Sequence, residues 1–148
     1  MEVKMPNKTN SFLPYENTQI GFKIEYPSNC PPMEIGSLVS FCGMVVGDIS
    51  TLLNKKFVSL DEVTNEAIKV DTGGGKEKFT STPITLHGGV PANKIDVKGP
   101  TGESGLIRIV TLKDGTAYTV LLTSIGGKIN ETNLPIFQRM VDSFQITK

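Results

Sequence analysis

The stretch Tyr15-Glu-Asn-Thr-Gln-Ile-Gly-Phe-Lys-Ile-Glu-Tyr-Pro27 decides the fold of this chain. From Gly21 onward, apolar residues occupy every second position and charged residues lie between them: Phe22, Ile24 and Tyr26 against Lys23 and Glu25. Such alternation is typical of a strand with one buried face. Pro27 ends the strand because proline has no amide hydrogen to donate to a neighbouring strand.

The C-terminal stretch Leu134-Pro-Ile-Phe-Gln-Arg-Met-Val-Asp-Ser-Phe144 has a different period. Its apolar residues repeat at helical spacing and predict an amphipathic helix with one buried face: Ile136, Phe137, Met140, Val141 and Phe144. Thr132 or Asn133 can cap the helix, and Pro135 lies in the first turn, where a missing amide hydrogen is tolerated. A last short strand follows.

A second helix is predicted to begin at Ser59, whose hydroxyl can accept from the Glu62 amide while Glu62 reaches back in a capping box. Its buried stripe is formed by residues at helical spacing: Leu60, Val63, Ala67 and Val70. Gly73-Gly-Gly75 ends the helix, since glycine adopts the left-handed backbone conformation that helix ends favour.

The remaining apolar runs predict strands and a mixed fold. One strand is expected at about Leu38–Val46, and four form an antiparallel meander at about residues 78–86, 90–98, 106–113 and 117–125. Gly88-Gly89 and Asp114-Gly115 are two-residue hairpin signals. The predicted fold class is α+β, an α/β/α sandwich in which one central antiparallel sheet is flanked by the two helices.

Length and charge limit the organisation and the partners. The 148 residues suffice for one domain, predicted at 15–148 behind a flexible N-terminal tail at 1–14. Fifteen basic residues balance fifteen acidic ones. Because they form no basic cluster, we expect no nucleic-acid partner. No apolar run approaches the ~20 residues that a membrane helix needs.

The two segments above, taken together, resemble the opening and closing segments of the PsbP/Mog/DcrB superfamily. Further similarity lies in the helix start at Ser59-Leu-Asp-Glu62 and in the turn Leu86-His-Gly-Gly-Val-Pro-Ala92. Two features depart from the family. The chain has no Trp, with Cys30 near the position where the family commonly carries one. Its N-terminal segment lacks the length and the histidine by which chloroplast PsbP proteins act on the manganese centre.

The resemblance implies a non-catalytic accessory protein with a protein partner, extracytoplasmic or secreted, with peripheral membrane association through a removed anchor. The alternative is an intracellular regulator that docks a folded protein, as Mog-type members do. Binding is expected on three loops: Cys30–Gly36, Asp48–Lys56 and Gly73–Lys76.

Cys30 and Cys42 leave two interpretations open. They are either two partly buried free thiols, or a disulfide that joins the exit of one strand to a neighbouring strand and indicates an oxidising compartment. Without a Cys-x-x-Cys or Cys/His spacing, we expect no zinc site.

No other motif supports catalysis. His87 is the only histidine and precedes a predicted turn. Gly102-Glu-Ser-Gly105 lacks the last glycine of a nucleophile elbow. Gly73-Gly-Gly-Lys76 follows a helix, whereas a phosphate-binding loop precedes one. The sequence therefore predicts no catalytic, cofactor-binding or metal-binding residues.

Overall fold

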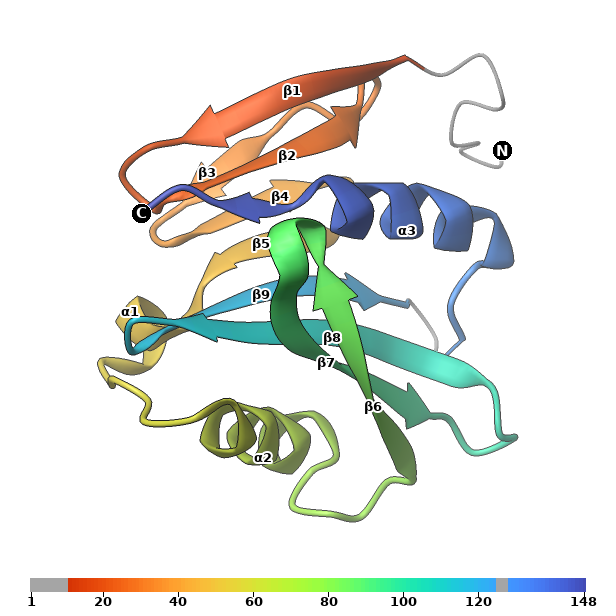
Figure 1. The fold of residues 1–148 in the computed structure, drawn as a ribbon. Helices are drawn as coiled ribbons and strands as arrows, with labels where there is room; N and C mark the ends of the chain where they lie inside the picture. The colour runs from red at the N-terminus through yellow and green to blue at the C-terminus, as the bar shows by residue number, and fades with distance from the viewer. Residues whose placement is uncertain (1–10, 125–127) are drawn as a thin grey trace.

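The fold is built on a large antiparallel sheet. The computed structural model describes residues 11–124 and 128–148. Seven strands form this sheet in the order β3-β4-β5-β9-β8-β7-β6 (Figure 1). Their bounds are β3 Met33–Ile35, β4 Leu38–Phe41, β5 Met44–Asp48, β6 Phe79–Leu86, β7 Val90–Lys98, β8 Ser104–Lys113 and β9 Thr116–Thr123.

A second, three-stranded sheet is formed by both ends of the domain. Its strands are β1 (Phe12–Asn17), β2 (Phe22–Pro27) and β10 (Gln145–Ile146), in the order β1-β2-β10. The prediction of a single sheet was therefore wrong in this detail. The alternation in β2 identifies a buried face but not the strand's neighbours, which are the segment before it and the end of the chain.

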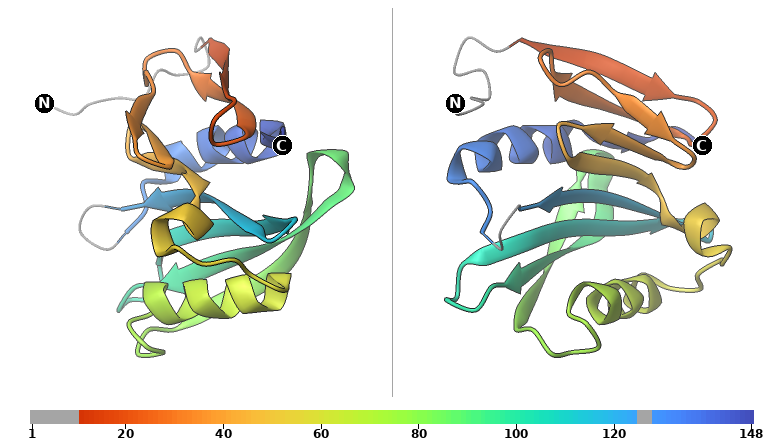
Figure 2. Two further views of the ribbon diagram at one scale, coloured as in Figure 1. Left: turned by 90° about the vertical axis from the view of Figure 1, so that its left-hand side faces the viewer. Right: turned by 180° about the vertical axis from the view of Figure 1, so that it is seen from behind.

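Helices complete the layers on both faces of the large sheet (Figure 2). Helix α3 (Leu134–Ser143), preceded by the short turn η2 (Glu131–Asn133), lies on one side together with the small sheet. Helices α1 (Ile49–Leu53) and α2 (Leu60–Asp71) lie on the other side. This arrangement confirms the predicted α+β sandwich.

Each face of the large sheet encloses its own apolar cluster. Strand β8 supplies both, because its side chains alternate between the two faces. Ile107 and Ile109 belong to the cluster under α3, whereas Val110 belongs to the cluster under α2. The predicted buried face of α3 is confirmed, since all five of its apolar residues are buried.

Helix α2 begins as predicted, but the Glu62 side chain bonds a different backbone amide from the one expected. The Ser59 hydroxyl accepts from the Glu62 amide at 3.1 Å. The Glu62 carboxylate accepts from the Val58 amide at 3.1 Å, one residue earlier than in a regular capping box. The glycines after α2 have positive φ angles and end it as expected.

One member of the predicted α2 stripe is wrong. Val63 and Ala67 are buried, but 65% of Val70 is exposed. Val70 lies seven residues after the buried Val63 and therefore projects from nearly the same side of the helix. It belongs to the last turn of α2, and helical spacing alone does not show that its side chain is exposed there.

The predicted strand Leu38–Val46 is instead the hairpin of β4 and β5. A two-residue turn at Cys42 and Gly43, with φ of 54° and 87°, divides it. A cysteine is an unusual residue for such a turn, so the sequence carries only the weaker glycine signal.

Two smaller differences concern element ends. Strand β1 begins at Phe12, inside the range 1–14 assigned to the tail, of which residues 1–10 lie outside the described part. The turn between β6 and β7 contains three residues, the 3-10 segment η1 (His87–Gly89), rather than two. The predicted strand end at Ile125 also lies outside the described residues.

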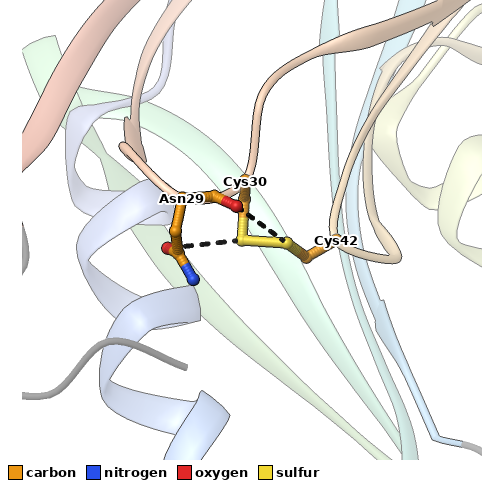
Figure 3. The surroundings of a disulfide bond; sticks show 3 residues. All are labelled: Asn29, Cys30 and Cys42. Atoms are coloured by element: carbon orange, nitrogen blue, oxygen red, sulfur yellow. Dashed lines mark hydrogen bonds between the residues drawn. A yellow bond between two sulfur atoms is a disulfide. The ribbon is translucent and has the colours of Figure 1, made fainter. Parts of the chain in front are cut away.

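Cys30 and Cys42 form a disulfide (Figure 3). Cys30 follows β2 of the small sheet and is buried, and Cys42 lies in the exposed β4–β5 turn of the large sheet. Of the two interpretations that the sequence left open, the disulfide is the one present. The bond joins the two sheets covalently.

Candidate functional site

Residues of α1 and α2 line an apolar groove. Both helices lie on the side of the large sheet opposite α3 (Figure 1). Its volume is about 100 Å³. The lining is mainly aliphatic, with three ionisable side chains among it: Ile49, Leu52, Leu53, Val63, Glu66, Ala67, Val70, Asp71 and Arg108.

Helix α1 is a single turn held at both ends. The Asp48 carboxylate accepts from the Thr51 amide at 3.0 Å and from its hydroxyl at 2.7 Å. Asn54 ends the helix in a left-handed conformation with φ of 51°. The buried Ser50 hydroxyl accepts from the Ala117 amide of β9 at 2.8 Å, which fixes α1 against the sheet. Leu52 and Leu53 consequently face outward.

The floor of the groove contains an ion pair between the sheet and α2. Arg108 projects from β8 toward α2 and donates to both carboxylate oxygens of Asp71, at 2.7 and 3.0 Å. A third guanidinium nitrogen donates to the Thr119 hydroxyl at 3.0 Å. The Asp71 side chain is only 4% exposed and that of Arg108 15%. Removal of either partner would leave an uncompensated buried charge, so the pair fixes the end of α2.

The rim exposes large apolar side chains. Leu52 is 61% exposed, Leu53 45% and Val70 65%. Isolated exposed leucines are common on protein surfaces, but apolar residues gathered around one recess mark interaction sites. These three line a single groove, which makes it the strongest candidate site in the described part of the chain.

Glu66 is the remaining charged residue of the lining. It is half-buried on α2, between Val63 and Val70 on the same side of the helix. No cation lies within 4 Å of its carboxylate among residues 11–124 and 128–148. The groove therefore combines an apolar surface with one uncompensated negative charge.

The three loops predicted to bind do not converge on this groove. The segment Asp48–Lys56 folds as α1 and lines it, whereas Cys30–Gly36 contains β3 and Gly73–Lys76 follows the far end of α2. The amides of Gly74, Gly75 and Lys76 donate to Lys69 and Thr72. Because these amides are already bonded, the glycine loop does not form a phosphate cradle.

The residues weighed for catalysis lie apart from one another. His87 is exposed in the β6–β7 turn and lines a separate open groove with Glu25 and Ser143. Ser104 begins β8, and its hydroxyl donates to Asp96 at 3.0 Å without a histidine partner. Within the described ranges, no three His, Cys, Asp or Glu side chains lie close enough together to hold a metal ion.

Sequence reasoning missed the Arg108–Asp71 pair, because 37 residues separate them and one sequence shows no pairing between elements. A partial signal was present in β8. Arg108 is the one charged residue within the apolar run Leu106–Leu112, and a charge on a strand with two buried faces needs a partner.

Comparison with known proteins gives a match in structure but not in sequence. No protein family and no curated protein matches the chain by sequence. The solution structure of cyanobacterial PsbP (CyanoP) from Synechocystis sp. PCC 6803 matches with a TM-score of 0.57, covering 99% of this chain and 98% of that one. The chain has a PsbP-like fold. At 11% identity the match establishes the PsbP-like fold alone.

None of the helices in the described part of the chain has the length and apolar character needed to cross a membrane.

Proposed function

We propose that this protein is a non-catalytic accessory protein that binds another protein through the α1–α2 groove. The observation that carries the proposal is the exposure of Leu52, Leu53 and Val70 around one apolar recess. Burial of apolar surface is the main driving force of protein association, at roughly 25 cal/mol per Å². The PsbP-like fold supports an accessory role, since cyanobacterial PsbP shares the architecture over nearly its whole length.

The rigid surroundings of the groove support binding without a large conformational change. The Arg108–Asp71 pair fixes α2 to the sheet, and the Ser50–Ala117 hydrogen bond fixes α1. A preformed surface loses little conformational entropy when a partner binds.

We also propose that the protein works outside the cytoplasm. The Cys30–Cys42 disulfide supports this location, because disulfides persist mainly in oxidising compartments. The intracellular Mog-type alternative predicts reduced thiols. Mass spectrometry of protein purified from its source under alkylating conditions distinguishes the two. Cysteines that alkylate without prior reduction would contradict the extracytoplasmic location.

Affinity capture with a matched pair of variants tests the proposed docking. Tagged wild type, a Leu53→Glu/Val70→Glu variant and a Met33→Glu/Ile35→Glu variant are incubated with extract of the source organism. Met33 and Ile35 are 64% and 62% exposed on edge strand β3, which does not line the groove. The proposal predicts a protein that wild type and the β3 variant retain and the groove variant loses.

Direct binding of that protein, purified, to wild type completes the test. Equal capture by all three proteins, or loss only in the β3 variant, would mean that the groove does not bind the partner.

A further inference from the structure

We infer that the α1–α2 groove recognises a partner segment in which one bulky aliphatic side chain lies next to a Lys or Arg. This inference rests on the proposed docking function and specifies the chemistry of the partner. It follows from the size of the groove and from the charges that line it.

The size of the groove limits the apolar part of the ligand. A cavity of roughly 150 Å³ lined by aliphatic residues is sufficient for a benzene ring. The groove, at about 100 Å³, is smaller and open to one side. It therefore accommodates one aliphatic side chain, such as that of leucine, isoleucine or methionine. The exposed side chains of Leu52, Leu53 and Val70 would surround that anchor.

The charges of the lining determine what lies beside the anchor. Arg108 and Asp71 neutralise each other through two hydrogen bonds, so neither attracts a charged ligand strongly. The Glu66 carboxylate also lines the groove, and no cation lies within 4 Å of it in the described part of the chain. The lining thus carries a net charge of one negative unit.

A docked partner would remove water from the Glu66 carboxylate. A carboxylate that loses water without gaining a partner destabilises the complex, whereas a Lys or Arg placed against it compensates the loss. An acidic residue at the same place would be repelled. Glu66 therefore selects against acidic neighbours of the anchor and in favour of basic ones.

Selection from a random 12-residue peptide library displayed on phage tests the inference with the folded protein alone. Wild type, Glu66→Lys, Val70→Glu and Glu131→Lys are used as parallel targets. Glu131 is an exposed carboxylate of η2 outside the groove, so its charge reversal controls for a general change in net charge.

We expect wild type and Glu131→Lys to enrich peptides with an aliphatic residue beside Lys or Arg, and Val70→Glu to lose them. Glu66→Lys should enrich acidic neighbours instead. A synthetic peptide of the wild-type motif should bind Glu66→Lys roughly three- to tenfold more weakly than wild type, a loss that shrinks in high salt.

The outcomes separate the two proposals. Two results would overturn the inference and leave the docking function standing. In the first, the selected peptides depend on Val70 but carry no Lys or Arg beside the aliphatic residue. In the second, Glu66→Lys does not change the preferred neighbour from basic to acidic. Absence of any Val70-dependent peptide would overturn both. Sedimentation velocity on wild type supplies a last check, because self-association abolished by Val70→Glu would make a second copy the occupant.

Discussion

Tyr118 shows how a single polar atom is accommodated in the apolar cluster under α3. Its side chain is 2% exposed, and its hydroxyl donates to the backbone carbonyl of Ile20 at 3.3 Å. Burial raises the pKa of the Tyr118 hydroxyl above 10.0, and the negative charge of Asp48 raises it further. The hydroxyl therefore stays neutral in the folded protein at a pH at which an unfolded tyrosine already ionises.

This pKa shift predicts a loss of stability in alkali. Below pH 10 the hydroxyl is neutral in both states, and its contribution is fully present. Above pH 10 the unfolded state releases the proton first, so the free energy of unfolding falls. Tyr118→Phe should lower that free energy by about 1 kcal/mol at pH 7, through the lost hydrogen bond. It should also reduce the alkaline decline.

Urea unfolding of wild type and Tyr118→Phe between pH 7 and pH 11 measures both effects. Curves that stay parallel through the whole range would show that Tyr118 has no part in the alkaline decline.

Individual residues also mark the limits of sequence reasoning. The sequence predicted the buried face of α3 completely, because its apolar residues fall at helical spacing. It failed at Val70, where the apolar pattern continues beyond the contact with the sheet. Apolar residues at the margin of a stripe follow the same pattern whether they are buried or exposed. For this reason the sequence did not show that Val70 lies on the rim of the candidate groove.

At the level of elements, local hydrogen bonds determine where α2 begins, whereas no side-chain cap bond is present at the start of α3. The Ser59 hydroxyl and the Glu62 carboxylate satisfy backbone amides at the start of α2 that have no partner within the helix. These bonds involve residues close in sequence, so the start of α2 could be predicted from a short motif.

Ser59→Ala should destabilise the protein by about 1 kcal/mol, because the Glu62 amide loses its acceptor. Ser28→Ala, at an exposed serine outside any helix, serves as the control and should stay within roughly 0.5 kcal/mol of wild type. Thermal and urea unfolding give both values. A Ser59→Ala variant as stable as the control would show that the cap contributes nothing.

Turns were predicted only where the residue type is diagnostic. Asp114-Gly115 forms the two-residue turn between β8 and β9 as expected, with φ of 51° and 81°. The same conformation at Cys42-Gly43 was missed, so β4 and β5 were merged into one strand. Cys42, which has a positive φ angle in that turn, is also the residue that forms the disulfide with Cys30.

In the whole molecule, the two sheets enclose the apolar cluster under α3. The contacts inside this cluster join residues that lie far apart in the chain. The aromatic rings of Phe22 and Phe144 lie 5.9 Å apart, joining the first alternating segment to the last helix. The sequence predicted both segments and the sandwich, but not the separate small sheet. Strand pairing between the two ends of the chain depends on tertiary contacts that no local pattern encodes.

The Cys30–Cys42 disulfide links these two sheets and closes a loop with a sequence separation of 12. In the chain-entropy account, such a loop contributes roughly 3 kcal/mol. A Cys30→Ala/Cys42→Ser variant should fold with its free energy of unfolding lowered by about that amount. Reductant should destabilise wild type and leave the variant unaffected. If reductant changed neither protein, the disulfide would have no stabilising role.

Site-specific photo-crosslinking tests the docking groove most directly. Benzoylphenylalanine is placed at Leu53 in the groove or at Met33 on β3, two exposed apolar positions. The account predicts a light-dependent adduct with a partner protein from position 53 and none from position 33. Adduct formation from position 33 alone, or none from position 53, would contradict a partner-binding groove between α1 and α2.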